Sequence, residues 1–148
     1  MIALLQRVTE AAVHVNGQEV AAIGAGIMAL VGVQKNDTTA QADRLLERLL
    51  SYRIFPDDEG RMNLDVRQAG GGLLLVPQFT LAANTKKGKR PSFTSAAAPE
   101  DGKRLFEYFC DRSNETFGPT GTGLFGADMK VSLVNDGPVT FWLEVTPF

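Results

Sequence analysis

The sequence has 148 residues, of which 44% are hydrophobic and 22% are charged, and its formal net charge is −2. These values predict one soluble globular domain over residues 1–148 with a hydrophobic core, and the acidic balance gives no general support for a nucleic-acid partner. No apolar run approaches the ~20 residues that cross a bilayer, and the first residues lack the basic stretch of a secretory signal. The single cysteine, Cys110, excludes an internal disulfide, so we expect a cytoplasmic protein without a membrane partner.

The first quarter of the chain predicts three strands. Residues 2–8 alternate between two faces, as the side chains of a β-strand do. Residues 11–23 predict a hairpin that turns at Asn16-Gly17. The run from Ile27 to Val33 is continuously apolar, which is typical of a strand that is buried on both faces.

Two segments predict helices. Thr38, followed three residues later by Gln41, forms a capping-box pattern, and the helix that it begins should end before Pro56. A second helix should begin near Pro99, because acidic residues follow where the helix dipole favours them. The expected core positions of the two helices are Ala42, Leu45, Leu46, Leu49 and Leu50, and then Leu105, Phe106, Phe109 and Cys110.

The remaining segments predict a short central strand, Leu73 to Val76, and two final strands, about Lys130 to Val134 and Val139 to Val145. Several strands in hairpin order and two sizeable helices predict an α/β fold. We expect a single domain of mostly antiparallel strands with two main helices, and not a doubly wound parallel sheet.

The chain lacks the side chains that most hydrolases use. Its only histidine, His14, falls on the face opposite Val13 and Val15 and should be exposed, while Cys110 lies on the core face of a predicted helix. One histidine and one cysteine do not make a zinc site, and no phosphate-binding glycine loop occurs. We therefore expect no metal and no cofactor. Any catalysis must use backbone donors, hydroxyl or amide side chains, or groups that the substrate supplies.

A first candidate motif follows the central strand and contains Pro77, Gln78, Phe79 and Thr80. Because proline lacks an N–H donor, Pro77 should interrupt the strand ladder and leave the backbone N–H groups of Gln78 and Phe79 free to meet a ligand. Two such donors would form an oxyanion hole, and Thr80 adds a hydroxyl group. The same residues are also compatible with an ordinary strand end that has a polar edge.

A second candidate motif, Asn135-Asp136-Gly137-Pro138-Val139-Thr140, lies between the two final strands. One interpretation is an ordinary hairpin turn. The other is a cis Gly137-Pro138 peptide, which would direct the adjacent carbonyl groups differently from a trans turn. Arg7 shares a strand face with apolar residues, so it either reaches solvent at the strand end or donates hydrogen bonds to the carbonyls of a special turn.

Four cations lie within five residues shortly after the first motif, namely Lys86, Lys87, Lys89 and Arg90. An isolated basic run of this kind is typical of a solvated loop, and a phosphate-binding loop is the alternative. The pattern leaves both interpretations open.

Over essentially its whole length the chain resembles the bacterial D-aminoacyl-tRNA deacylases. The likeness rests on the two motifs and on four further stretches, which are specific in their order and spacing: Gln6-Arg7-Val8, Tyr52-Arg53-Ile54-Phe55, Lys89-Arg90-Pro91-Ser92-Phe93 and residues 131–141. The resemblance implies hydrolysis of the ester between tRNA and a D-amino acid, or glycine mischarged on tRNA(Ala), as chiral proofreading in translation.

The resemblance also implies a homodimer, in which a cis Gly137-Pro138 dipeptide reaches the active site of the partner subunit. There its carbonyl groups, with Val139 beside them, would exclude an L side chain, and Arg7 would hold the turn. The four basic residues become candidate contacts for the tRNA.

The match at the first motif implies a catalytic role for Gln78, Phe79 and Thr80, which would contact the substrate carbonyl and α-amine, with Pro77 at the substrate site. The terminal ribose 2′-hydroxyl of the tRNA would assist hydrolysis in place of a protein nucleophile.

Pro77 departs from the usual family motif, which has serine at this position. A related animal group that removes L-alanine from a mismatched tRNA is similar in having proline there, but it has alanine in place of Phe79 and a trans Gly-Pro. Phe79 and Arg7 match the D-specific group. Two alternative hypotheses remain: editing of L-alanyl-tRNA, and nucleic-acid binding without catalysis.

Overall fold

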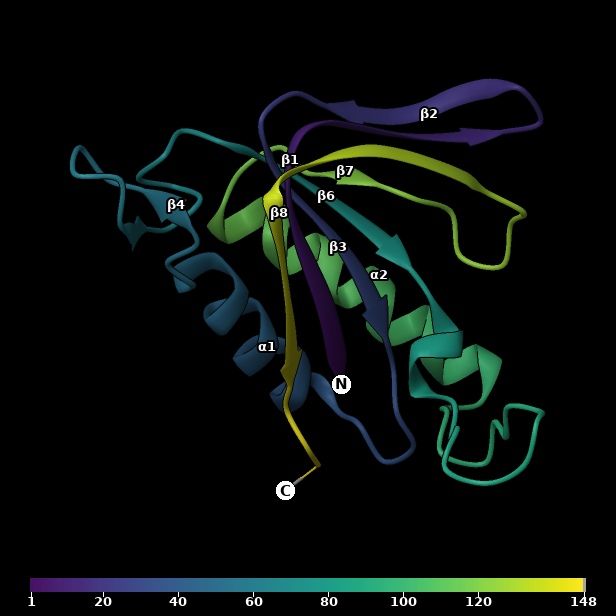
Figure 1. Ribbon diagram of the computed structural model, residues 1–148. Helices are drawn as coiled ribbons and strands as arrows, with labels where there is room; N and C mark the ends of the chain where they lie inside the picture. Colours follow the sequence, from purple (N-terminus) through teal and green to yellow (C-terminus); the bar gives the residue numbers. More distant parts are fainter. Residues whose placement is uncertain (148) are drawn as a thin grey trace.

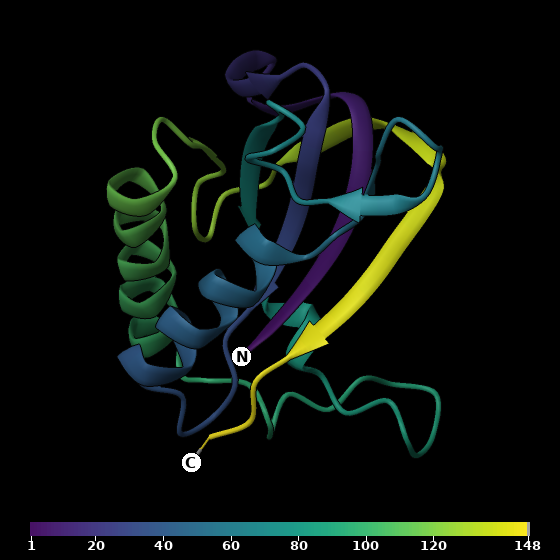
Figure 2. The same cartoon turned by 90° about the vertical axis from the view of Figure 1, so that its left-hand side faces the viewer.

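The structure, a computed structural model, describes residues 1–147. Two helices cover one face of a twisted six-stranded sheet, and a small two-stranded sheet lies beyond one end of α1 (Figures 1 and 2). No helix in this part of the chain is long and apolar enough to cross a membrane. The elements are β1 Ile2–Val15, β2 Gln18–Ile23, β3 Gly26–Gly32, α1 Thr39–Ser51, β4 Phe55–Pro56, β5 Met62–Leu64, β6 Gly72–Pro77, the 3-10 helix η1 Phe79–Ala82, α2 Pro99–Thr116, β7 Gly121–Thr122 and β8 Lys130–Glu144.

The large sheet combines antiparallel and parallel pairs. Its order is β2-β1-β3-β6-β7, and β8 pairs with β1. β1 is antiparallel to all three of its neighbours, whereas β3, β6 and β7 are parallel. The predicted single α/β domain with mostly antiparallel strands and two main helices is confirmed. The parallel centre is the part that the sequence pattern did not predict.

Both helices begin where their capping signals place them. The Thr38 side chain accepts a hydrogen bond from the N-terminal turn of α1, and the Gln41 Oε1 atom accepts one from the Thr38 N–H at 2.6 Å. α2 begins at Pro99. All the predicted core positions of the two helices are buried in one cluster with the inner faces of β1, β3 and β6. This cluster fixes the sheet against the helices.

The two predicted final strands form one continuous strand, β8, and both of its halves pair with β1. The paired residues shift from Gln6↔Thr140 to Val8↔Asn135. Between these two pairs, β8 advances by five residues while β1 advances by two. The three extra residues leave the ladder as a wide bulge. The hairpin-turn interpretation is therefore wrong, because Gly137-Pro138 protrudes from the middle of a strand.

Candidate functional site

The first motif spans the end of β6 and the start of η1. Pro77 is buried and pairs with Val31 of β3. The backbone N–H of Gln78 then donates to the Val31 carbonyl at 2.8 Å. The prediction that Pro77 frees this N–H is wrong, because proline removes only its own donor and the ladder continues for one more residue.

The next two backbone N–H groups are the available donors. Within residues 1–147 the structure records no acceptor for the N–H of Phe79 or of Thr80. These residues open η1, and the first N–H groups of a helix have no preceding carbonyl in reach. The predicted free donor at Phe79 is confirmed, and Thr80 supplies the second donor in place of Gln78.

Two further features fix η1. The Thr80 Oγ1 atom accepts a hydrogen bond from the Gln78 side-chain amide, which leaves the hydroxyl proton of Thr80 free to donate. Gly32 at the end of β3 lets η1 approach closely, because a Cβ atom there would lie 2.9 Å from the Leu81 Cβ and 3.2 Å from the Gln78 carbonyl oxygen.

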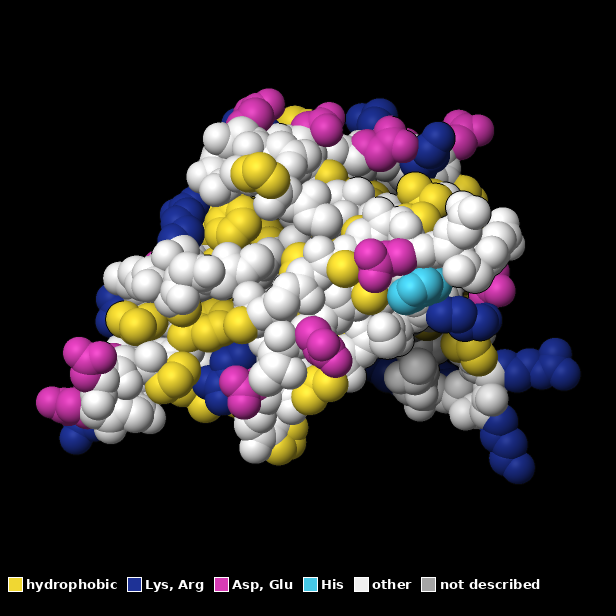
Figure 3. Space-filling view, turned by 90° about the horizontal axis from the view of Figure 1, so that it is seen from above, with side chains coloured by type: hydrophobic (Ala, Val, Ile, Leu, Met, Phe, Trp, Pro, Cys, Tyr) yellow, Lys and Arg dark blue, Asp and Glu magenta, His cyan; other side chains and the backbone are white. Residues whose placement is uncertain are grey.

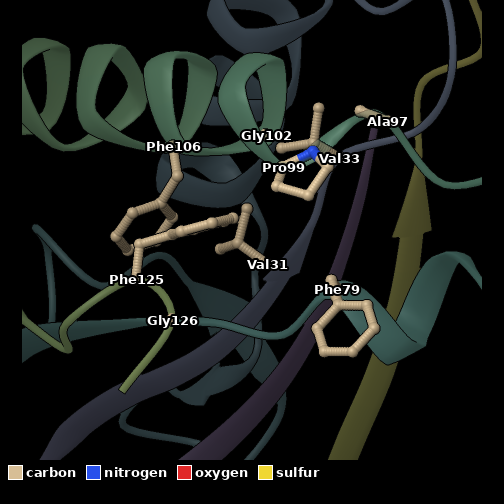
Figure 4. Close-up of a pocket in the computed structure, with 9 residues that line it drawn as sticks. All are labelled: Val31, Val33, Phe79, Ala97, Pro99, Gly102, Phe106, Phe125 and Gly126. Atoms are coloured by element: carbon tan, nitrogen blue, oxygen red, sulfur yellow. The ribbon is translucent and has the colours of Figure 1, made fainter.

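An apolar cavity of about 230 Å³ opens beside Phe79. Figure 4 shows the rings of Phe106 and Phe125 together on one side of it and Phe79 on the other. None of its lining residues carries a titratable side chain. Sequence reasoning missed the cavity because its walls come from segments far apart in the chain. The lining residues are Val31, Val33, Phe79, Ala97, Pro99, Gly102, Phe106, Phe125 and Gly126.

The second motif is held by Arg7. The Gly137-Pro138 peptide is cis, as the family resemblance implies. The Arg7 Nε atom donates to the Asp136 carbonyl at 3.0 Å, and its Nη1 atom donates to the Ile54 carbonyl at 2.7 Å. Arg7 therefore holds the bulge of β8 instead of reaching into solvent. Val139 is 6% exposed and belongs to the core, and its backbone N–H donates to the Asn135 side chain at 2.6 Å.

The two motifs lie far apart within one chain. Pro77 pairs with Val31, whereas Gly137-Pro138 lies opposite Arg7, which pairs with Ile27. Four residues along β3 span about 13 Å, and the three strand spacings from β8 to β6 span about 14 Å, so the motifs are ~19 Å apart. One chain does not bring its carbonyl-bearing dipeptide to its own backbone donors.

The basic residues Lys86, Lys87, Lys89 and Arg90 are all exposed. They lie in the loop between η1 and α2, which projects from the body of the protein (Figure 2). Backbone hydrogen bonds of 2.7 and 3.0 Å between Asn84 and Ser92 close the base of this loop. The loop directly follows η1, and the ring of Phe93 at its end lies 5.3 Å from the ring of Phe79.

The single cysteine and the single histidine of the sequence lie elsewhere. Burial raises the pKa of the Cys110 thiol to about 12. His14 is half-buried instead of fully exposed, and it pairs with Lys130 at the far end of β1 (cyan in Figure 3). Neither residue lines the cavity beside Phe79.

Comparison with known proteins finds one family along nearly the whole chain. The family described as D-Tyr-tRNA(Tyr) deacylase matches residues 4–144. A D-aminoacyl-tRNA deacylase of Thioalkalivibrio sulfidiphilus is 65% identical over 147 residues, which cover 99% of each chain. One of Escherichia coli O1:K1 / APEC is 57% identical and covers 98% of this chain and 100% of the relative.

Solved structures have the same architecture. A chain described as c-Myc DNA Unwinding Element Binding Protein is 36% identical with a TM-score of 0.95, and the match covers 99% of each chain. A probable eukaryotic D-amino acid tRNA deacylase has a TM-score of 0.84 over 97% of this chain and 98% of its own. Its identity is 19%, so that likeness shows the fold alone.

Proposed function

The chain belongs to the D-Tyr-tRNA(Tyr) deacylase family, and from that premise we propose that it hydrolyses the ester bond of D-aminoacyl-tRNA at a site that two copies of the chain build together. The observation that carries the proposal is the pair of backbone N–H groups at Phe79 and Thr80. Phe79 lines the apolar cavity, and neither N–H group has an acceptor within residues 1–147. Adjacent free donors of this kind suit the oxyanion of an acyl-transfer reaction.

In the proposed reaction, water attacks the carbonyl carbon of the ester. The bond from this carbon to the ribose 3′ oxygen breaks, and a proton passes to that oxygen, which yields the free amino acid and tRNA. The N–H groups of Phe79 and Thr80 hold the developing negative charge, and each donor of this kind contributes about 10²- to 10³-fold in rate. Because no acid or base lines the cavity, the neighbouring ribose 2′-hydroxyl positions the water and relays the proton.

The cavity beside Phe79 takes the terminal base of the tRNA. Single-stranded nucleotides are commonly bound by stacking on aromatic side chains, and Phe106 and Phe125 offer such rings in an apolar space of about 230 Å³. A base in this space places its ribose, and the ester on that ribose, near the first residues of η1.

Selection by chirality rests on Gly137-Pro138 of the second copy. Its carbonyl groups stand against the α-carbon of the substrate, where a hydrogen atom fits and an L side chain does not. An apolar side chain at this place would also leave buried carbonyls unpaired. D-aminoacyl-tRNA and glycyl-tRNA, including glycine mischarged on tRNA(Ala), are therefore the proposed substrates, and the reaction is chiral proofreading.

The homodimer is supported by the separation of the motifs and by the exposed edge of β8. A distance of about 19 Å within one chain requires a second copy if the dipeptide is to reach the donors. Within residues 1–147 β8 pairs only with β1, and Val134 and Trp142 on it are 49% and 51% exposed. In a two-fold arrangement each copy gives its dipeptide to the other.

Lys86, Lys87, Lys89 and Arg90 are the proposed contacts for the phosphates of the tRNA acceptor end. Exposed cations on a projecting loop position a nucleic acid without reading its sequence. This suits an enzyme that selects its substrate by the chirality of the amino acid.

A second candidate function is nucleic-acid binding without catalysis. It is favoured by the likeness to the c-Myc DNA Unwinding Element Binding Protein and by the exposed basic loop. This function predicts salt-sensitive binding of nucleic acid with no cleavage of an ester.

The direct test compares the hydrolysis of D-tyrosyl-, L-tyrosyl-, glycyl- and L-alanyl-tRNA by the purified protein. We expect rapid loss of the D-tyrosyl and glycyl esters, with the L-tyrosyl ester spared. Thr80→Ala keeps the backbone N–H but removes the hydroxyl group that is free to donate to the substrate, so it should slow the reaction without unfolding the protein. Cleavage of L-alanyl-tRNA alone would favour the editing hypothesis that Pro77 motivates. Binding of tRNA with no cleavage of any ester would favour the second candidate function.

A further inference from the structure

The bulge of β8 has lost the strand ladder that would hold its backbone. Opposite the single residue Arg7, the four residues 136–139 have no paired position on β1. A protruding segment of this kind needs other hydrogen bonds if its carbonyl groups are to keep one direction. Arg7 supplies them at the first half of the bulge, where it binds the Asp136 carbonyl.

The side chain of Asn135 closes the second half of the bulge. Its Oδ1 atom accepts a hydrogen bond from the Val139 N–H at 2.6 Å. Its Nδ2 atom donates to the Thr140 Oγ1 at 2.9 Å and to the Gln6 Oε1 at 3.4 Å. The acceptor and the donors of one amide are thus all engaged, which fixes its orientation.

This contact controls a particular carbonyl group. The N–H of Val139 and the carbonyl of Pro138 belong to the same planar trans peptide, in which the two groups point in opposite directions. Because Asn135 draws the N–H toward the base of the bulge, the Pro138 carbonyl oxygen must point outward. The direction of this oxygen is therefore set by a side chain that lies outside the Gly137-Pro138 dipeptide.

We infer that Asn135 is a positioning residue for chiral selection, which aims the Pro138 carbonyl into the partner's site and is itself oriented by Thr140 and Gln6. The inference rests on the proposed function, in which that carbonyl excludes an L side chain. Asn135 does not touch the reacting atoms at the site of its own chain, because its bulge lies about 19 Å from Pro77 at the end of β6.

The test measures kcat/KM for D-tyrosyl- and L-tyrosyl-tRNA in the full-length protein and in three variants. Asn135→Ala should lower the D-to-L ratio by about tenfold or more, because a displacement of ~1 Å at a reacting site costs up to about a hundredfold. Asn135→Asp keeps the acceptor for the Val139 N–H, so it should restore most of the ratio. Thr140→Val keeps the shape but removes the oxygen that orients the amide, and it should give an intermediate ratio.

Asn114→Ala is the matched control. The Asn114 Oδ1 atom likewise accepts a backbone hydrogen bond, from Thr120 at 3.1 Å, but it lies in the last turn of α2 and outside the site. This variant should leave the D-to-L ratio unchanged even if its urea midpoint falls. A change of the ratio in Asn135→Ala and not in Asn114→Ala therefore separates positioning from general stability.

The D-to-L ratios of the wild type and of the variants distinguish a failure of the role given to Asn135 from a failure of the proposed function. A wild-type protein that does not distinguish the two esters would overturn the proposed function, and the inference with it. A selective wild type with an Asn135→Ala variant of equal selectivity would overturn the inference alone. If Asn135→Ala does not fold, the ratios of Asn135→Asp and Thr140→Val decide, and a Thr140→Val variant with the wild-type ratio contradicts the inference.

Discussion

Gly137 is the residue at which the backbone leaves least room for change. Its φ angle is +137°, and an added Cβ atom would lie 2.6 Å from the Val139 Cγ2 and 3.3 Å from the Arg7 Nη2. An L side chain there is strained by the backbone angle and also displaces two residues that hold the bulge. The glycine is thus required by the geometry of the bulge and of its support.

Gly137→Ala should reduce the kcat/KM for D-tyrosyl-tRNA by about tenfold or more, because the carbonyl groups of the dipeptide move from their positions. The measurement is steady-state deacylation with the urea midpoint recorded in parallel. Gly60→Ala is the control, since Gly60 has a φ angle of +80° but no neighbour within 4 Å of the added atom. An active Gly137→Ala variant with wild-type selectivity would contradict the assigned role of the bulge.

The proposed reaction uses no protein nucleophile, so the thiol of Cys110 should take no part in catalysis. Burial raises the pKa of its thiol from an ordinary 9.0 to about 12, so the thiolate is scarce near neutral pH. We predict that Cys110→Ala keeps the wild-type turnover and that the native thiol resists alkylation at pH 8 while the unfolded thiol reacts. A variant without activity would show that catalysis uses this thiol.

The same shift predicts a pH effect on stability. Because the folded pKa is raised, the folded protein keeps the thiol proton at pH values where the unfolded chain loses it. This contribution to stability is complete below pH 9.0 and is lost as the pH rises toward about 12. Cys110→Ala should therefore show a smaller loss of stability above pH 9 than the wild type in urea titrations.

The basic residues of the loop between η1 and α2 should affect the binding of tRNA and not the rate of the chemical step. Lys87→Glu together with Lys89→Glu should raise KM for D-tyrosyl-tRNA several-fold and reduce its salt dependence, while kcat and the D-to-L ratio stay the same. Each lost phosphate contact lowers the slope of log affinity against log salt by about one. Arg44→Glu with Arg61→Glu makes the same change in net charge on α1 and between β4 and β5, away from this loop, and should have little effect.

At the scale of elements, the site depends on how closely η1 lies on β3. Gly32→Ala would push an added Cβ against Leu81 and the Gln78 carbonyl, at 2.9 and 3.2 Å. We predict a lower kcat for D-tyrosyl-tRNA, because the N–H groups of Phe79 and Thr80 move with η1. The cost in stability should be about 1–3 kcal/mol, as for other overpacked contacts.

Gly24→Ala is the control for this prediction, since nothing lies within 4 Å of a Cβ atom added there. Both variants are measured by deacylation kinetics and urea unfolding. Unchanged kcat in Gly32→Ala, together with a lower urea midpoint, would mean that the position of η1 does not matter for catalysis.

Elements with local signals could be predicted from the sequence. The capping box at Thr38 and the apolar stripe after it define α1 within a few residues, and Asn16-Gly17 with positive φ angles makes the predicted turn. The 3-10 helix η1 and the two-residue strand β7 carry no such signal, because their positions follow from contacts with β3 and β6.

The errors in the candidate site have the same physical origin. Sequence reasoning identified the right segment around Phe79 and Thr80 but left the Gln78 N–H free, since its acceptor, the Val31 carbonyl, is on another strand. It placed Gly137-Pro138 in a turn between two strands, because the pairing of both halves of β8 with β1 is a long-range feature. The residues were predictable, and the partners of their backbone groups were not.

At the scale of the whole molecule, the register of the sheet separates the two motifs that the proposed function brings to one substrate. The donors lie at the end of β6 and the dipeptide lies across three strands, in a different row of the sheet. Two copies solve this problem if each places its Gly137-Pro138 at the η1 of the other. The central claim is therefore that each site combines the N–H groups of Phe79 and Thr80 from one subunit with the carbonyl groups of Gly137-Pro138 from the other.

A hybrid dimer tests this claim most directly. Thr80→Ala and Gly137→Ala chains with different affinity tags are co-expressed, the dimer that carries both tags is purified, and its hydrolysis of D-tyrosyl-tRNA is measured. If the site is shared, one of its two sites combines an intact Thr80 with an intact Gly137-Pro138, and the hybrid should regain about half of the wild-type rate. A hybrid that is no more active than the two parent variants would contradict the account, because each chain would then carry its complete site alone.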